Sequence, residues 1–110
     1  MIGDTIGKIE KRLQASQAVK PEAREELLGL LATLKEEVQQ LATTHGEQAE
    51  SITRFTEVSA HEATREGKNP ELAEISLKGL AASVDGFEKS HPQLVQLVNR
   101  ICTTLSNLGV

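Results

Sequence analysis

Apolar residues recur at intervals of three and four along most of this chain, which is the spacing of one face of an α-helix. Four such stripes follow one another: Ile2, Ile6, Ile9 and Leu13; Leu27, Leu31, Leu34, Val38, Leu41, His45, Gln48, Ile52, Phe55 and Ser59; Ala73, Leu77, Leu80, Val84 and Phe87; and Leu94, Val98, Ile101, Leu105 and Leu108. The second stripe becomes polar at His45 and Gln48. The pattern predicts an all-α fold in which helices span most of the chain.

Proline and glycine mark where these helices begin and end. Pro21 suits the first position of a helix, and so does Pro70, which follows Gly67 and the helix-capping residue Asn69. The segment Gly67–Asn69 is therefore the predicted turn between two long helical segments. A second interruption is expected at Pro92, because the residue before a proline disfavours helix. The last helix is expected to stop at Gly109.

Folding the chain back at Gly67–Asn69 keeps the stripes in register. Leu31 then meets Leu105, Leu34 meets Ile101, Val38 meets Val98, Leu41 meets Leu94, Ile52 meets Val84 and Phe55 meets Leu80. We therefore predict one domain over 1–110, built as an elongated, coiled-coil-like antiparallel helical hairpin. Its arms are 21–66 and 70–108, the second broken near Pro92, and residues 1–17 form a short amphipathic helix.

The two arms are also expected to bend at the same level, near Gly46 and His91. An unbroken helix over 21–66 would be about 69 Å long, which exceeds any compact domain of this size. Gly46 costs about 1 kcal/mol relative to alanine within a helix, and Pro92 removes a backbone donor. The same register brings His45 opposite His91.

Composition narrows the class of protein. The 110 residues carry a formal charge of -4, with 38% hydrophobic and 2% aromatic residues, so the core is aliphatic. No basic stripe with aromatic residues suggests a nucleic-acid partner. The single cysteine, Cys102, indicates no disulfide framework, and the apolar runs are too short to span a membrane. We expect a cytoplasmic location.

The candidate chemical groups are few. His45 and His91, if adjacent, are candidates for metal binding or a response to pH, but a third ligand is not evident. Glu57 and His61 are four residues apart and offer only two ligands, and Cys102 reads as a small core residue. Neither a phosphate-binding loop nor a nucleophile with a base is evident, so we expect no catalysis and no cofactor.

The breadth of the apolar faces predicts self-association. On helical wheels the segments around Leu28 and Leu97 spread their apolar residues over about 160°, more than one helix contact buries. We therefore expect a homodimer, through a two-fold interface, with Leu28, Leu97 or Leu108 touching the second copy. The stripe over 2–13, with Lys8, Lys11 and Arg12 opposite, is expected to pack on the hairpin or a second subunit rather than on a membrane surface.

The C-terminal part resembles a known family. The motif Glu88-Lys89-Ser90-His91-Pro92, the leucine-rich helix after it and the ending Leu108-Gly109-Val110 are similar to a small bacterial family of unknown function. The resemblance covers about residues 20–110 and implies a helical fold and a bacterial source, without an activity. The leading hypothesis is a non-enzymatic, self-associating interaction or scaffold module. The alternative is a regulatory or sensing protein that uses His45 and His91.

Overall fold

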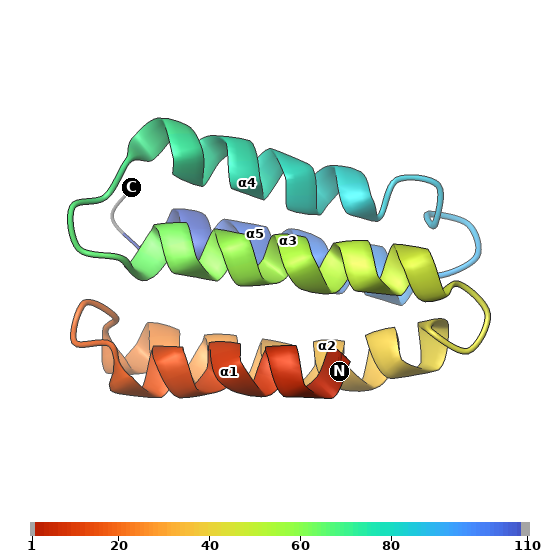
Figure 1. Ribbon diagram of the computed structural model, residues 1–110, viewed down its shortest axis with the longest axis horizontal. Helices are drawn as coiled ribbons and strands as arrows, with labels where there is room; N and C mark the ends of the chain where they lie inside the picture. The colour runs from red at the N-terminus through yellow and green to blue at the C-terminus, as the bar shows by residue number, and fades with distance from the viewer. Residues whose placement is uncertain (1, 109–110) are drawn as a thin grey trace.

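The computed structural model describes residues 2–108, which form five helices and no strand (Figure 1). The helices are α1 (Ile2–Ala15), α2 (Pro21–Leu41), α3 (Gly46–Thr64), α4 (Pro70–Ser83) and α5 (Pro92–Ser106). The all-α prediction is confirmed. The expected helix stop at Gly109, and Met1 of the predicted 1–17 segment, lie outside the described residues.

The hairpin is folded in two and is not elongated. Residues 2–108 fit within 37 × 24 × 21 Å, with a radius of gyration of 12.9 Å. The first predicted arm is divided into α2 and α3, which turn back on each other, and the second is divided in the same way into α4 and α5. The physical reason is burial, because folding back covers the broad apolar faces that a straight hairpin leaves in water.

The helices predicted to pair across the hairpin still meet in this folded form. α2 packs against α5, and α3 packs against α4, as the register of the stripes requires. Between them the turn lies where the sequence predicts it. Gly67 has a φ of +61°, and the Asn69 side chain accepts hydrogen bonds from the backbone N–H groups of Glu71 and Leu72. The turn at Gly67–Asn69 is therefore confirmed.

The two breaks lie at the same end of the bundle (Figure 1). The chain leaves helix at 42–45 between α2 and α3, and at 84–91 between α4 and α5. His45 and His91 are the N-cap residues of α3 and α5, and their backbone angles are nearly equal, with φ of -133° and -139° and ψ of 63° and 61°. The predicted joint break is thus confirmed.

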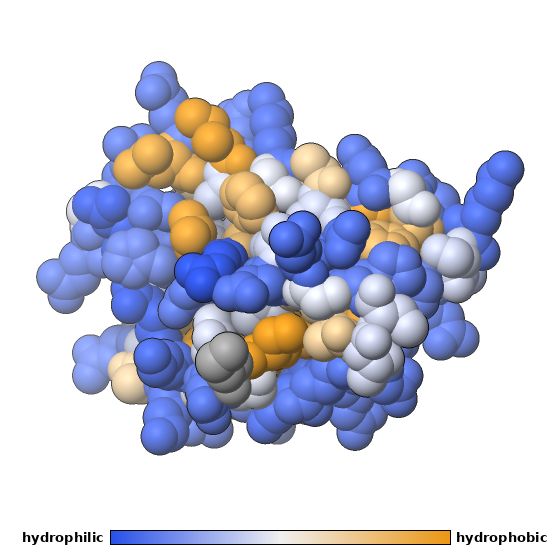
Figure 2. Space-filling view, turned by 45° about the vertical axis from the view of Figure 1, so that its right-hand side comes forward, coloured by the Kyte–Doolittle hydropathy of each residue, from blue (hydrophilic) through white to orange (hydrophobic). Residues whose placement is uncertain are grey.

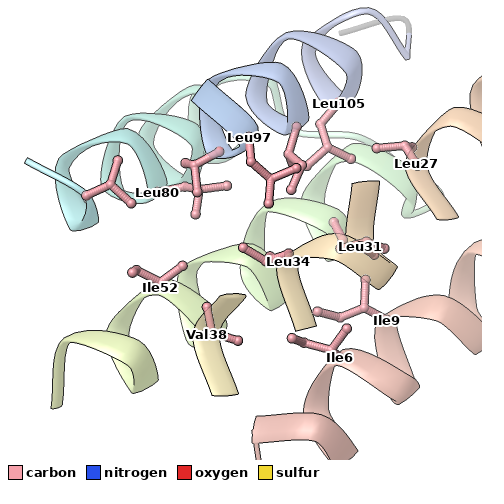
Figure 3. Close-up of a cluster of buried hydrophobic side chains, with 14 of the residues drawn as sticks. Ile6, Ile9, Leu27, Leu31, Leu34, Val38, Ile52, Leu80, Leu97 and Leu105 are labelled. Atoms are coloured by element: carbon pink, nitrogen blue, oxygen red, sulfur yellow. The ribbon is translucent and has the colours of Figure 1, made fainter. Parts of the chain in front are cut away.

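The core is aliphatic and receives side chains from all five helices (Figure 3). Ile6, Ile9 and Leu13 of α1 are buried against α2 and α3, which confirms that the N-terminal stripe packs on the rest of the chain. The Arg24 guanidinium holds the end of α1 by donating to three backbone carbonyls, at 2.7 to 3.1 Å: those of Leu13, Ser16 and Val19.

Helix α3 is central, and most of the residues that it buries are small, Ile52 and Glu62 being the exceptions. It packs against each of the other four helices. Its buried face includes Ala49, Thr53, Thr56, Ser59, Ala60 and Ala63. The Thr53 and Thr56 hydroxyls donate to carbonyls one turn earlier, which satisfies them inside the core. Phe55, predicted to lie in the seam against Leu80, is instead 40% exposed. Small side chains draw the helices together and leave no room between them for the ring.

Candidate functional site

The two histidines predicted to face each other do so, around Phe87. The ring centroids of His45 and His91 are 6.1 Å apart, and each lies within 5.5 Å of the Phe87 ring, all three in edge-to-face arrangements. A hydroxyl of the preceding residue bonds to Nδ1 of each imidazole, Thr44 at 2.8 Å and Ser90 at 2.9 Å. The cluster therefore joins the two loops at one end of the bundle.

This cluster has the geometry of a structural contact more than of a metal centre. The two Nδ1 atoms are engaged locally, which leaves one nitrogen of each ring for a metal ion. The Glu88 carboxylate accepts from the backbone N–H of Gly86 at 2.7 Å, so it caps the turn. Among residues 2–108, no group of three or more His, Cys, Asp or Glu side chains is placed to hold a metal ion.

The three predicted interface residues are buried or partly buried by their own chain. Leu97 is buried with only 9% of its surface exposed, and Leu28 and Leu108 are partly buried against the core. The reason for expecting a second copy at these residues was the uncovered flanks of a straight hairpin. Folding back, together with α1, covers much of both flanks. The structure therefore gives no reason to place an interface at Leu28, Leu97 or Leu108.

The remaining candidates have no catalytic surroundings. Burial raises the pKa of the Cys102 thiol, which lies 3.8 Å from the carbonyl oxygen of Leu77, so the thiol stays protonated at neutral pH. His61 lies 3.8 Å from Glu62, and Glu62 binds Arg65 at 3.2 Å. Both contacts lie near the C-terminal end of α3, and Glu57 lines the same surface pocket between α1 and α3 as His61 and Glu62. Within residues 2–108 these side chains are not placed to hold a metal ion.

A surface that the sequence analysis did not single out is more unusual. Four large apolar side chains are exposed on α3 and α4: Phe55 (40%), Val58 (46%), Leu72 (44%) and Ile75 (64%). We call this set the apolar face. Figure 2 shows apolar side chains gathered at the surface in its upper left part, at the height of α4 and α3. Neighbouring exposed apolar residues of this size mark interaction surfaces more often than isolated ones do.

The apolar face is continuous across the two helices. Phe55 and Val58 are one turn apart on α3, and Leu72 and Ile75 are one turn apart on α4. The Phe55 ring lies on Gly79, where an added Cβ would overlap it. α3 and α4 are antiparallel neighbours. Val58 lies one turn after Phe55 on α3, and Ile75 lies one turn before Gly79 on α4, so Val58 and Ile75 are at the same level.

Polar residues occupy the buried side of the same helix pair. Ser59 of α3 is 1% exposed and Ser76 of α4 is 5% exposed, and Ser76 donates to the carbonyl of Ala73. Within residues 2–108 the Ser59 hydroxyl has no hydrogen-bond partner. The pair thus buries some hydroxyls beside its apolar core residues, such as Ile52 and Leu80, while four large apolar groups are exposed. Local departures of this kind from the usual pattern are expected at functional sites.

An internal repeat allows this face to be compared with its counterpart. Residues 46 positions apart match in the two helical hairpins: Leu31 with Leu77, Leu34 with Leu80, Val38 with Val84, His45 with His91, and Arg54 with Arg100. The packing follows the same repeat. The first helix of each hairpin packs on the second helix of the other hairpin, α2 on α5 and α4 on α3. The four-helix part of the bundle therefore has approximate two-fold symmetry.

The counterpart of the apolar face has no large apolar side chain exposed. The equivalents of Phe55, Val58, Leu72 and Ile75 are, in that order, Ile101, Thr104, Glu26 and Gly29. Thr104 donates a hydrogen bond to Glu26 at 3.2 Å, and Ile101 is buried. The fold thus accepts polar residues at these positions. The sequence signal that identifies the face is this comparison of repeats, because helical periodicity alone places Phe55 in the core.

The fold and these sites define the class of protein: a small helical bundle of two similar hairpins, closed at one end by a histidine–phenylalanine cluster and bearing an apolar face. Within this class the chain belongs to the family described as domain of unknown function DUF4404, whose model matches residues 27–110. Comparison with curated proteins and with solved structures gave no match. Among residues 2–108, no helix combines the length and apolar content needed to cross a membrane.

Proposed function

We propose that this chain is a non-enzymatic interaction module that self-associates through the apolar face of α3 and α4. One observation carries the proposal: four large apolar side chains are 40% to 64% exposed on adjacent helices. Their counterparts in the other hairpin are polar, absent or buried, so the fold does not require them. Removing this apolar surface from water favours association.

The occupant of the face is a second copy of the chain. A second copy supplies an equal apolar face, so the exposed groups of both copies are buried together in an isologous contact. This changes the location predicted from the sequence, Leu28, Leu97 or Leu108, but keeps the predicted homodimer. The bacterial source and cytoplasmic location expected from the sequence belong to the same proposal.

The test replaces two members of the face by their own counterparts. Val58→Thr with Leu72→Glu reproduces the pair Thr104 and Glu26, which the chain already accommodates. Glu at position 72 is also three residues after the cap Asn69, where it favours helix formation. We expect light scattering after size exclusion to show a dimer for the natural chain at high concentration and a monomer for the variant.

Circular dichroism of both proteins is the control, and equal helix content is expected. The proposal is wrong if the natural chain is a monomer at several hundred micromolar, or if the folded variant dimerises as well as the natural chain.

A second function is favoured by the contact between His45 and His91, which suits a sensing role. In this role the free nitrogens of the two rings would bind a metal ion, so zinc is expected to raise the melting temperature of the natural chain, and His45→Gln with His91→Gln is expected to abolish that rise. Thermal unfolding with and without zinc tests this hypothesis. Equal behaviour of the two proteins would refute it.

A further inference from the structure

The charges beside the apolar face define the orientation of the second copy. We infer that two chains associate about a two-fold axis perpendicular to α3 and α4, passing between Val58 and Ile75. In this arrangement α4 lies antiparallel on α4 of the second copy, and α3 lies antiparallel on α3. The inference rests on the self-association proposed above and adds the register of the contact.

The charge order along α4 supports this register. Glu71 lies four residues before Ile75 and Lys78 lies three residues after it. The two charges are therefore on the same face of α4 as Ile75, one helical turn away from it in opposite directions along the helix. Both side chains are exposed, and Lys78 forms a surface ion pair with Glu74 of its own helix at 3.0 Å. A two-fold axis at Ile75 places Glu71 of each copy opposite Lys78 of the other.

The charges along α3 have the same order, but only one of them is exposed. Arg54 lies four residues before Val58, and its side chain is 72% exposed and binds Glu50 at the surface. Glu62 lies four residues after Val58, but it is buried and binds Arg65, the C-cap residue of its own helix, at 3.2 Å. The exposed pair Glu71 and Lys78 of α4 therefore carries the argument for the antiparallel register.

A parallel axis gives a poorer match. A two-fold axis parallel to the helices would lay α3 of one copy on α4 of the other. Each residue would then face residues of the second copy at the same height along the axis. Arg54 would then approach Lys78 of the second copy, because both lie near the level of the Phe55–Gly79 contact. Like charges across an interface disfavour the wrong arrangement. The perpendicular axis is the one that the charges select.

The face is small, so the dimer is expected to be weak. α3 has 19 residues and is about 28 Å long, and two helices side by side are about 20 Å wide. This footprint is at or below the roughly 800 Å² per partner of a standard interface. We expect a dissociation constant on the order of tens of micromolar, a range in which charge changes are easily measured.

Charge reversal tests the register by sedimentation velocity of the full chain. Glu71→Lys and Lys78→Glu are each expected to weaken the dimer about three- to tenfold, since each creates two repulsive contacts across the axis. The double variant restores opposite charges and is expected to return within about twofold of the natural dissociation constant. Glu25→Lys, the equivalent position of α2, is the matched control and should leave the dimer unchanged.

Restoration in the double variant, with an unaffected control, supports the register. If the double variant is as weak as the single ones, or if Glu25→Lys weakens the dimer equally, the register is overturned. The proposed function still stands in that case when Val58→Thr with Leu72→Glu is monomeric. Absence of a dimer in the natural chain overturns the proposed function itself.

Discussion

At the scale of single residues, small side chains between α3 and α4 determine what reaches the surface. Ser59 and Ser76 are buried between these helices, and Gly79 lies under the Phe55 ring. A ring of this size does not fit into a contact made by serine and glycine, so it lies over the groove. The exposure of Phe55 thus follows from Gly79, although the spacing of Phe55 in its stripe is that of a core residue.

Substitution of Gly79 tests this contact. Gly79→Ala places a Cβ inside the Phe55 ring, so the half-exposed ring must shift and lose its contact. We expect this substitution to stabilise the fold by clearly less than the gain of about 1 kcal/mol that alanine has over glycine in a helix. Gly29→Ala is the matched control, because nothing lies within 4 Å of its added Cβ and alanine favours helix by about 1 kcal/mol. Urea unfolding measures both changes. Equal stabilisation by the two substitutions would show that Phe55 does not lie on Gly79.

The Cys102 thiol gives a prediction that depends on pH. Burial raises its pKa above the usual 9.0, so the folded protein holds the thiol proton more tightly than the unfolded chain does. Its contribution to stability is complete below pH 9 and decreases as the pH rises further. Alkylation by iodoacetamide at pH 8 is expected to be slower in the folded protein than in urea, since the thiolate reacts. Equal rates would contradict this burial.

At the scale of helices and turns, the sequence was sufficient to predict where the helices end and which turns lie close together. The order Gly67, Asn69, Pro70 predicts the turn because each residue favours one backbone state there, and the structure has that turn. The adjacency of His45 and His91 followed from register alone, and their rings are in contact. The exposed apolar face did not follow, because periodicity identifies a helical face but not the neighbour that covers it.

Transplanting the apolar face to the other hairpin tests whether it is sufficient for association. Glu26→Leu, Gly29→Ile and Thr104→Val place the residues Leu72, Ile75 and Val58 at their equivalent positions. Gly29 is exposed and has free space around it, so isoleucine is accommodated. We expect species larger than a dimer, because each chain then has two apolar faces.

Light scattering measures this outcome against the natural chain at equal concentration. A transplanted protein with the natural mass distribution and natural helix content would show that the apolar face does not cause association.

At the scale of the whole molecule, the sequence predicted the pairing of segments but not the compact shape. α2 meets α5 and α3 meets α4, as expected for the hairpin, and yet the bundle is 37 Å long and not elongated. The bend at both breaks was expected, but its size depends on the total apolar area that folding back removes from water. No short segment of the sequence determines this total apolar area. The same folding buries Leu97 and partly buries Leu28 and Leu108, and an interface at these three leucines stays an untested prediction.

The location of the contact between copies is the central claim, and methyl NMR on a dilution series tests it most directly. As the concentration of the natural chain falls from about 500 to 20 micromolar, the methyl signals of Val58, Leu72 and Ile75 are expected to shift together along one binding curve. The methyl signals of Leu28, Leu97 and Leu108 should stay unchanged. Concentration-dependent shifts at those three leucines, with none at the apolar face, would contradict the account.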